Sequence, residues 1–375
     1  MELRIPLSAP DVADADIEAV VEVLRTPRLS IGPKMAAFER AVACFVGATE
    51  GVAVSSGTAG LHLVLRALNI GEGDEVILPS FTFVAAGNVI LNERARPVFA
   101  DIDPATLNID PQKIEARITP RTRAILVVHT FGRPADLDPI LALARRHGLR
   151  VIEDACEAIG AEYRGRRVGC IGDAGVFGFY PNKPITTGEG GMVVTCDRQL
   201  AETMRALRNQ GRRESDGWTG HSLLGYNYRL SELNCALGVA QMQRLTEILD
   251  RRATIAARYQ EALRGTRGIV PPPLSINEGR VCWFVYVVRL GSQFTRQDRD
   301  ALCERLTARG IGCGRYFAPL HLQPLFAPYT PRPGELANTE QAADRTIALP
   351  FFNRLTDGEI GEVCVALGES IRQLG

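Results

Sequence analysis

Short apolar runs alternate with segments of helical periodicity from residue 14 to about 245. Ile17, Val20, Val21 and Leu24 share one helical face. Thr58–Leu68 is predicted to be a helix with Leu61, Val64, Leu65 and Leu68 turned inward, and Leu137–His147 and Gln199–Asn209 are also predicted helices. The predicted strands are Val52–Val54, Glu75–Leu78, Pro97–Ala100, Ala124–His129, Val151–Glu153, Gly175–Phe179 and Met192–Thr195. Buried strands that alternate with helices predict an α/β layer architecture around a largely parallel sheet.

The pattern changes beyond about Met242. A long predicted helix, Arg244–Leu263, leads into Pro271-Pro272-Pro273, a stiff connector. Cys282–Leu290 is predicted to be a strand and Thr295–Arg309 a helix, and Thr356–Glu359 opens a last helix with a capping-box pattern. The sequence therefore predicts two domains: residues 1–245 form a large domain and residues 246–375 a smaller α+β domain.

Composition and charge narrow the choice of partners. The 375 residues suit about two domains. Lys plus Arg and Asp plus Glu both number 43, so the net charge is zero. Because the chain has no overall basic field, we expect neither non-specific nucleic-acid binding nor attachment to an anionic membrane. A local anion-binding pocket stays possible.

The nine cysteines are odd in number and include no C-x-x-C pair or metal-type spacing, so we expect free thiols and no metal. Free thiols indicate a reducing compartment. The first residues show no signal-peptide pattern, and the apolar stretch Val76–Leu91 is interrupted by Pro79 and polar residues. We expect a cytoplasmic protein that does not span a membrane.

Three segments place chemically useful residues at the ends of predicted strands, where α/β sheets bind ligands. The first is Val54-Ser-Ser-Gly-Thr-Ala-Gly60, in which a strand passes through small residues into a helix. The positive end of that helix suits a phosphate, Gly57 permits close approach of the backbone, and Ser56 and Thr58 add hydroxyl groups. For this segment taken by itself, the alternative is an N-cap turn that holds no ligand.

The second segment is Arg150–Ile159, in which Asp154 follows an apolar strand and Glu157 comes one helical turn later. A carboxylate at that buried edge needs a cationic or N–H partner, and an N-cap aspartate is the alternative. The third segment, Phe177–Gly191, holds Lys183 between aromatic residues and a glycine-rich loop with Thr186, Thr187 and Glu189. A lysine shielded from water can attack a carbonyl and form a Schiff base; a structural lysine is the alternative.

The three segments together meet the needs of pyridoxal 5′-phosphate (PLP). Its phosphate needs a helix end, its aldehyde needs an amine, and its ring nitrogen needs a carboxylate. Phe83, in Pro79-Ser-Phe-Thr-Phe83 at another strand end, is available to cover the ring, although it could equally be a core residue.

The sequence resembles the DegT/DnrJ/EryC1/StrS sugar aminotransferases, which are PLP enzymes of fold type I, nearly from end to end. The segments that carry the resemblance are Leu29–Pro33, Ser55–Ala59, Pro79–Phe83, Val98–Asp103, His129–Asp136, Ile152–Ala158, Lys183 with Thr186–Gly191, Gly225–Arg229, Pro319–Pro324 and Leu349-Pro350. The Lys-x-x-Thr-Thr-Gly-Glu-Gly-Gly string is the most specific of these.

The resemblance assigns roles to individual positions. It implies that Lys183 is the Schiff-base lysine and proton shuttle and that Asp154 pairs with the pyridine nitrogen. It places Glu157 near the ring hydroxyl, Gly57 and Thr58 at the phosphate, and Phe83 against the ring. Asn227 resembles a residue that reaches the neighbouring subunit's phosphate site, which implies a homodimer. Arg229 and His321 are candidate substrate contacts, with structural roles as the alternative, and His129 is expected in the core or behind the site.

Three positions depart from the family pattern. Gly178 stands where many members have a phosphate-binding serine, so a backbone N–H or a water would have to replace that hydroxyl. Pro184 follows the lysine where Asn or Gln is common, and Pro27-Arg28 replaces a frequent Gly-Trp.

The resemblance implies an aminotransferase that moves an amino group from L-glutamate, through pyridoxamine phosphate (PMP), to a keto-deoxyhexose carried on a nucleotide diphosphate. A PLP- or PMP-dependent sugar dehydratase is one alternative, although such enzymes have His where Lys183 stands. A non-catalytic ligand-binding or regulatory protein on the same fold is another. The sugar, the nucleotide and the carbon that receives nitrogen are left open, and the acceptor could also be a cyclitol.

Overall fold

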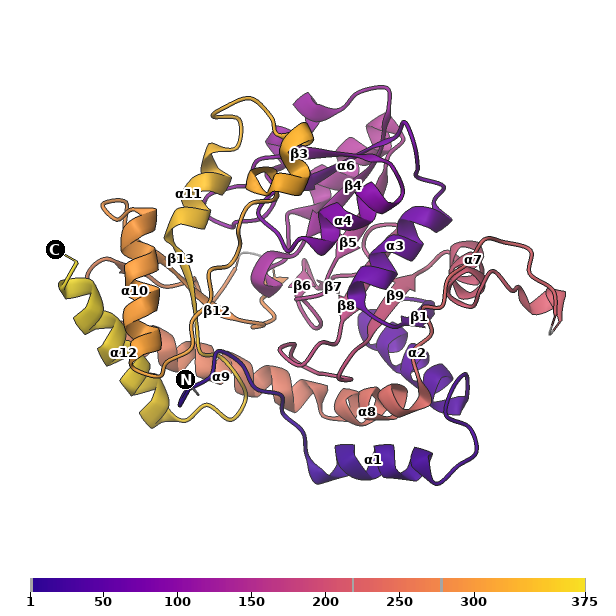
Figure 1. The fold of residues 1–375 in the computed structure, drawn as a ribbon, viewed down its shortest axis with the longest axis horizontal. Coiled ribbons are helices and arrows are strands. Elements are labelled where there is room, and N and C mark those ends of the chain that lie inside the picture. Colours follow the sequence, from indigo (N-terminus) through magenta and orange to yellow (C-terminus); the bar gives the residue numbers. More distant parts are fainter. Residues whose placement is uncertain (1–2, 218, 277–278, 375) are drawn as a thin grey trace.

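The computed structural model describes residues 3–217, 219–276 and 279–374, and its centre is a seven-stranded sheet (Figure 1). The strand order is β1-β9-β8-β5-β4-β2-β3, and β9 runs antiparallel to both neighbours while the other pairs are parallel. The bounds are β1 Glu50–Val54, β2 Glu75–Pro79, β3 Arg96–Ala100, β4 Thr122–Val128, β5 Arg150–Asp154, β8 Ala174–Gly178 and β9 Gly191–Thr195. The predicted, largely parallel α/β sheet is confirmed.

Helices cover both faces of the sheet, because successive strand residues are buried on opposite sides. Val52 and Val54 face one core with the helices after β1, β2 and β9, whereas Ala53 faces the other. The first layer holds α3 Gly57–Ala67, α4 Ala85–Asn92 and α7 Arg198–Arg208. The second holds α2 Pro33–Val46, α5 Pro111–Ile114, α6 Leu137–His147 and α8 Glu232–Gln243.

A second unit follows the long helix α9, Leu245–Ala262. A three-stranded antiparallel sheet, β10-β12-β13, packs against helices around its own apolar core. Its elements are β10 Ile269–Val270, β12 Tyr286–Leu290, β13 Thr346–Leu349, α10 Arg296–Ala308, α11 Ala337–Arg345 and α12 Asp357–Arg372. The capping box predicted at Thr356 and Glu359 is present: the Thr356 amide donates to the Glu359 carboxylate, and the Glu359 amide donates to the Thr356 hydroxyl.

The two cores share one helix. Leu245, Ile248 and Leu249 at the start of α9 belong to the core of the large sheet, whereas Ile255 and Tyr259 belong to the C-terminal core. Ile5, near the N-terminus, pairs with Ile311 in the C-terminal unit. The division between residues 245 and 246 stays a prediction.

The structure differs from two predictions that were made from the apolar pattern. In α1, Asp14–Leu24, the side chains of Ile17 and Leu24 are more than half exposed, and the buried residues are Asp16 and Val23. The predicted strand over 282–290 begins only at Tyr286, because buried Arg252 on α9 takes the carbonyls of Trp283 and Phe284.

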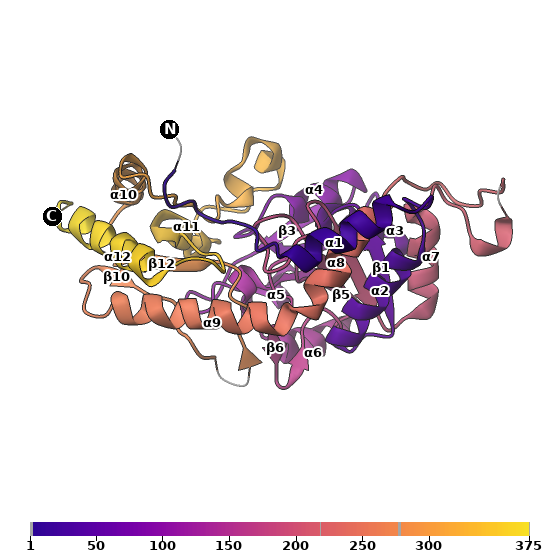
Figure 2. The ribbon, with the colours of Figure 1, turned by 90° about the horizontal axis from the view of Figure 1, so that it is seen from below.

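Two peripheral features complete the outline. A small sheet joins β6 Glu162–Tyr163, β7 Arg166–Arg167 and β11 Gly279–Arg280. The connection between α7 and α8 extends away from the body as an arm, which both views show at the right (Figures 1 and 2). Within the residues that the structure describes, no helix is long and apolar enough to cross a bilayer.

Candidate active site

A cavity of about 410 Å³ lies at the carboxyl ends of β1, β5 and β8. Six of the nine residues singled out from the sequence line it: Gly57, Thr58, Phe83, Asp154, Glu157 and Lys183. They come from four separate strand-to-helix or strand-to-loop connections, which the parallel sheet brings to one edge. Their convergence makes this cavity the candidate active site.

The connection from β1 to α3 forms the small-residue cradle that the sequence predicts. Ser56 caps α3, and its hydroxyl accepts a hydrogen bond from the Ala59 amide (3.0 Å). The amides of Gly57 and Thr58 have no acceptor inside the helix, because the first turn lacks preceding carbonyls. A Cβ at Gly57 would stand 2.7 Å from Sγ of Cys156, so a glycine is required for this close approach.

Asp154 is the last residue of β5, and its side chain is buried at the cavity wall. Its Oδ1 accepts a hydrogen bond from the Cys156 amide (3.1 Å). Burial raises the pKa of Asp154, while hydrogen bonds from Cys156 and the charge of Lys183 act in the opposite direction. A cationic ring nitrogen placed beside this carboxylate would compensate for its burial.

Glu157 is buried next to Asp154 and accepts a hydrogen bond from the Phe131 amide (2.9 Å). Burial raises the pKa of Glu157, and the neighbouring charge of Lys183 opposes the rise. The carboxylate is therefore fixed by one backbone donor and faces the lysine across the cavity.

Lys183 lies on the loop after β8, where Phe179 anchors both sides of the loop. The Phe179 amide donates to the Gly190 carbonyl (2.9 Å), and the Phe179 carbonyl accepts from the Thr187 amide (3.0 Å). The side chain of Lys183 is only 14% exposed, and its Nζ lies 3.7 Å from Oε1 of Glu157. The loop therefore turns the lysine inward, away from solvent.

The other sequence candidates lie elsewhere. Asn227 is exposed and pairs with Asn209, and Arg229 donates to Oδ1 of Asn209 (3.0 Å) beside a separate hollow near α7. His321 is buried, with Nδ1 2.7 Å from the Ser80 hydroxyl and Nε2 3.3 Å from Glu340. Neither Asn227, Arg229 nor His321 lines the cavity within the described chain.

His129, expected in the core or behind the site, is fully buried and hydrogen-bonds to Glu153, the residue before Asp154. Phe83 lines the cavity but is 62% exposed, so one side of its ring is open in the isolated chain.

Several residues that line the cavity were not singled out from the sequence, among them Cys156, Phe284 and Tyr316. Cys156 sits between two residues that were recognised, so its position after β5 was a usable signal. Phe284 and Tyr316 come from the C-terminal unit, and no spacing rule connects them to a strand end of the large sheet.

The residues fit PLP. The cavity has the size of a small-molecule site and combines a helix N-terminus, a buried acid and an inward-facing amine. At Gly178, a Cβ would be 3.4 Å from Cys156, which is ordinary contact, so the missing serine leaves room for a water or a backbone donor.

Comparison with known proteins agrees with this geometry. The family model described as the DegT/DnrJ/EryC1/StrS aminotransferase family matches residues 10–368. GDP-perosamine synthase from Caulobacter vibrioides is 40% identical over 367 residues, covering 98% of each chain. The crystal structure of DesV from S. venezuelae, in complex with a ketimine intermediate, superposes with a TM-score of 0.88 at 38% identity and covers 95% of this chain and 94% of that one.

Spr1654 from Streptococcus pneumoniae, a putative sugar aminotransferase, has been solved in a PLP form that superposes with a TM-score of 0.93 at 25% identity, covering 99% of each chain. A PMP form of it superposes at 0.94, with 25% identity and coverage of 99% and 100%. The family match and the full-length relatives establish both the cofactor and the class of reaction. The chain therefore belongs to the DegT/DnrJ/EryC1/StrS aminotransferase family of PLP-dependent sugar aminotransferases.

Proposed function

We propose that this enzyme transfers an amino group from L-glutamate to a nucleotide-diphosphate-linked keto-deoxyhexose, with Lys183 as the amine that holds PLP. The observation that carries the proposal is that Lys183 and Asp154 line one cavity from the ends of the adjacent parallel strands β8 and β5. When bound, PLP supplies an aldehyde that condenses with amines and a pyridinium ring that accepts the electron pair left at the reacting carbon.

The chain's own residues divide the remaining work. The N-terminus of α3 at Gly57 and Thr58 would hold the phosphate, Asp154 would hold the ring nitrogen, and Phe83 would cover the ring. Lys183 carries the proton between the substrate carbon and the cofactor, since its Nζ is sheltered from water and only 3.7 Å from Glu157. Glu157 would lie near the ring hydroxyl and orient the lysine.

The acceptor is proposed from the relatives and from charge. GDP-perosamine synthase is named for a nucleotide-linked sugar. Arg229 and Arg213 line a large hollow beside α7, in which Arg198 and Arg205 are paired with Glu202 and Glu50. An anionic diphosphate in this hollow would be bound by Arg229 and Arg213. His321 is a weaker substrate candidate, because both of its ring nitrogens already have partners.

A homodimer completes the site in this proposal. Several large apolar side chains are exposed in the single chain. They include Ile17 and Leu24 on α1, Ile31, and Leu224, which lies on the arm between α7 and α8. A contiguous partner surface would cover such residues. Exposed Asn227, at the base of the arm, would then reach the phosphate of the neighbouring site.

The nine free cysteines support a reducing, cytoplasmic location.

The test is incubation of the purified enzyme with L-glutamate and a panel of nucleotide-linked 3-keto and 4-keto 6-deoxyhexoses, followed by mass and NMR analysis of the product. The expected result is an amino sugar together with an equal amount of 2-oxoglutarate. Lys183→Arg, which keeps a charge but cannot take the same role, should lose turnover while the fold is retained. Wild-type turnover by that variant would remove Lys183 from the reaction.

A further inference from the structure

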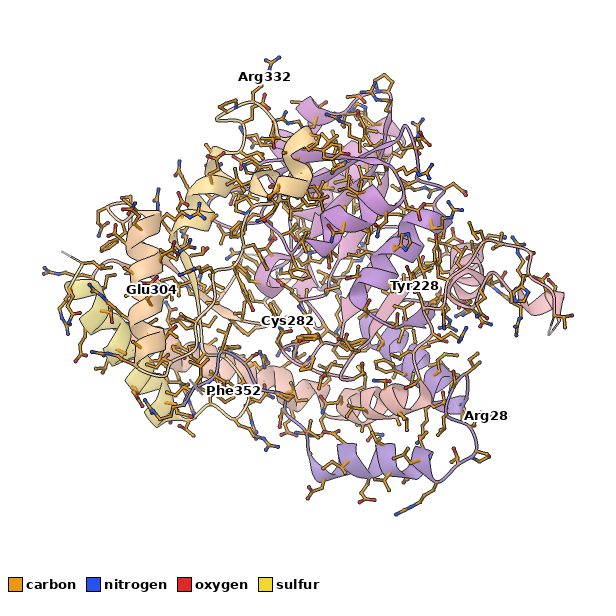
Figure 3. The ribbon with its side chains drawn as sticks, in the orientation of Figure 1. Arg28, Tyr228, Cys282, Glu304, Arg332 and Phe352 are labelled. Atoms are coloured by element: carbon orange, nitrogen blue, oxygen red, sulfur yellow. The ribbon has the colours of Figure 1, made fainter. Side chains whose placement is uncertain are left out.

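Two of the cysteines lie together in the C-terminal unit. Cys303 is on α10 beside Glu304, whose place Figure 3 marks, and Cys313 follows the end of that helix. The sulfur of Cys313 is 3.5 Å from the carbonyl oxygen of Cys303 and is in hydrogen-bond contact with the Cys303 sulfur. Because a disulfide needs two cysteines whose side chains already meet, this pair satisfies the first requirement for one.

Cationic side chains lie beside the Cys303 sulfur. The Arg315 guanidinium donates a hydrogen bond to it, and Arg299 acts on it by charge. Nε of Arg315 is also 3.0 Å from Oδ1 of Asp300 on α10, which holds the guanidinium beside the helix. The hydrogen bond from Cys313 and the bond and charge of Arg315 lower the pKa of Cys303 to about 7, although burial acts in the opposite direction. The thiolate is the form of cysteine that reacts with oxidants.

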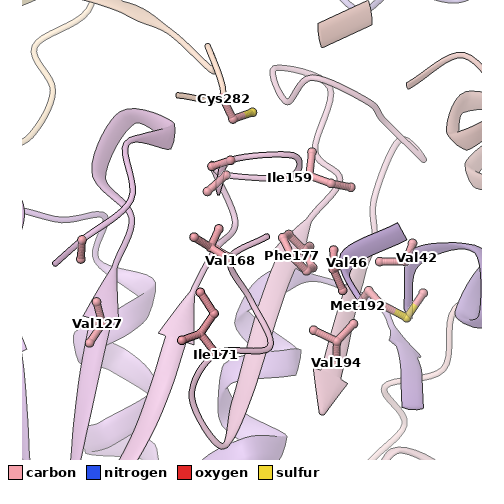
Figure 4. Packing of buried hydrophobic residues seen from close by; sticks show 14 of the residues in the cluster. Val42, Val46, Val127, Ile159, Val168, Ile171, Phe177, Met192, Val194 and Cys282 are labelled. Carbon is pink, nitrogen blue, oxygen red and sulfur yellow. The ribbon is translucent and has the colours of Figure 1, made fainter. Parts of the chain in front are cut away.

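Two other buried thiols have a different environment. Cys282 lies in the apolar core of the large sheet, where Figure 4 shows it above Ile159 and Val168, and burial raises its pKa to about 12. Burial also raises the pKa of Cys364 on α12 to about 12. Such thiols are protonated at neutral pH and inert. Cys364 is a matched control for Cys303, because both belong to the core of the C-terminal unit.

The backbone on both sides of the pair is fixed. Cys303 lies within α10, and Gly314, the residue after Cys313, pairs with β13 through two backbone hydrogen bonds (3.0 and 2.8 Å). Joining the two sulfurs therefore requires rotation of side chains and no movement of the chain. The two residues after Arg315 line the candidate active site, so the pair borders a segment of that site.

We propose that Cys303 and Cys313 are a modification site, a dithiol that a hydroperoxide converts reversibly to a disulfide. The Cys303 thiolate attacks one oxygen of hydrogen peroxide: an S–O bond forms, the O–O bond breaks and hydroxide leaves. The Cys313 thiol then attacks the sulfur of the resulting sulfenic acid: an S–S bond forms, and the oxygen leaves as water with the thiol proton. The thiols are oxidised and the peroxide is reduced. This inference goes beyond the proposed function and does not depend on it.

The oxidant has to be small, because Cys303 is buried and Cys313 is half-buried. The test therefore treats the PLP-loaded protein with hydrogen peroxide and identifies disulfides by mass spectrometry of peptides prepared without reductant. The expected result is a peptide pair joined through Cys303 and Cys313, which dithiothreitol separates again. Cys364→Ala should oxidise at the wild-type rate. Arg315→Gln, which removes the cation beside the sulfur, should oxidise roughly fivefold more slowly.

Single variants distinguish the attacking thiol from the resolving one. In Cys313→Ala, the sulfenic acid on Cys303 has no thiol to condense with, so dimedone added on unfolding should label Cys303. In Cys303→Ala, Cys313 should stay an unmodified thiol. Labelling of Cys313 in that variant, or a wild-type rate for Arg315→Gln, would overturn the proposal.

The wild-type protein supplies the remaining decision. If Cys303 and Cys313 both stay reduced while the exposed Cys44 and Cys196 are oxidised, the pair is not a redox site and the proposal is wrong. If circular dichroism shows that a variant does not fold, the peptide map of the wild-type protein decides alone.

Discussion

The imidazole Nε2 of His129 lies 3.0 Å from Oε2 of Glu153, and both side chains are completely buried directly behind Asp154. Nδ1 of His129 accepts a hydrogen bond from the Ala135 amide (3.1 Å), so Nε2 carries the proton and donates it to Glu153. Three backbone amides of the loop before β8 donate to the same carboxylate at 2.7 Å each. This network fixes the end of β5, which carries Asp154, the proposed partner of the cofactor's ring nitrogen.

We expect Glu153→Gln to destabilise the fold by about 3 kcal/mol at pH 7, because the carboxylate accepts four hydrogen bonds and an amide group cannot replace it. Although burial raises the pKa of Glu153, the bonds from His129 and the loop amides leave it lowered. Its stabilisation is therefore complete above the unfolded value, near 4.5, and is lost as the pH falls through the folded value.

Urea denaturation at pH 7 and at successively lower pH values measures this difference. The gap between Glu153→Gln and wild type should narrow in acid. Glu115→Gln, at an exposed ion pair with Arg146, is the control and should change stability by less than about 1 kcal/mol. A gap that widens in acid would contradict the assignment.

We expect Asp154→Asn to stabilise the cofactor-free protein by about 1 kcal/mol at pH 7 while abolishing transamination. Burial raises the pKa of Asp154, so its ionised form costs free energy in the fold. That cost is absent below the unfolded value, near 3.8, and complete above the folded value, so the advantage of asparagine should grow as the pH rises. Thermal denaturation of both proteins without PLP checks this, and a less stable variant at pH 7 would refute it.

We expect Gly57→Ala to weaken PLP binding at least tenfold, because its Cβ would stand 2.7 Å from Sγ of Cys156 at the mouth of the cradle. The double variant Gly57→Ala, Cys156→Ala should recover part of that loss. Gly178→Ser also adds a Cβ beside Cys156, but at an ordinary contact distance of 3.4 Å, so it controls for the presence of a side chain next to that cysteine. Its hydroxyl should tighten PLP binding by roughly fivefold. Fluorescence titration of the cofactor-free proteins gives all four dissociation constants.

We expect Lys183→Ala and Asn227→Ala to complement each other in a mixture. If Asn227 serves the neighbouring subunit, a mixed dimer holds one site with both residues intact, and about a quarter of all sites become active after subunit exchange. If Asn227 serves its own subunit, no intact site forms. The assay compares turnover of the mixture with that of each variant alone, and absence of recovery despite proven exchange would exclude the shared site.

Much of this fold was predictable because its strands are buried on both faces. Runs such as Val151–Glu153 have no solvent-facing alternation, so their apolar continuity marks them, and turns rich in glycine mark their ends. Asp154 could be singled out from the sequence for the same reason, because it directly follows such a run, and Lys183 comes four residues after the predicted strand Gly175–Phe179.

The contributions from the C-terminal unit could not be predicted in this way. Phe284 lies in an apolar run that favours a strand. Its carbonyl instead accepts a hydrogen bond from the guanidinium of Arg252, a residue distant in the sequence, and is therefore not available for strand pairing. On α1, Ile17 and Leu24 of the predicted apolar face are likewise exposed, whereas Val20 and Val21 are half-buried. The periodicity of apolar residues predicts which side of a helix or strand is buried, but it does not identify the part of the protein that packs against that side.

The sharing of α9 by both cores has a mechanical consequence. Its eighteen residues run without interruption from Leu245 to Ala262, so no hinge separates the large sheet from the C-terminal unit along this path. A rotation of the C-terminal unit relative to the large sheet would require α9 to bend or to lose its packing against one of the two cores. We therefore expect substrate to enter and leave by movement of peripheral loops, with the two lobes held at a fixed relative position by α9.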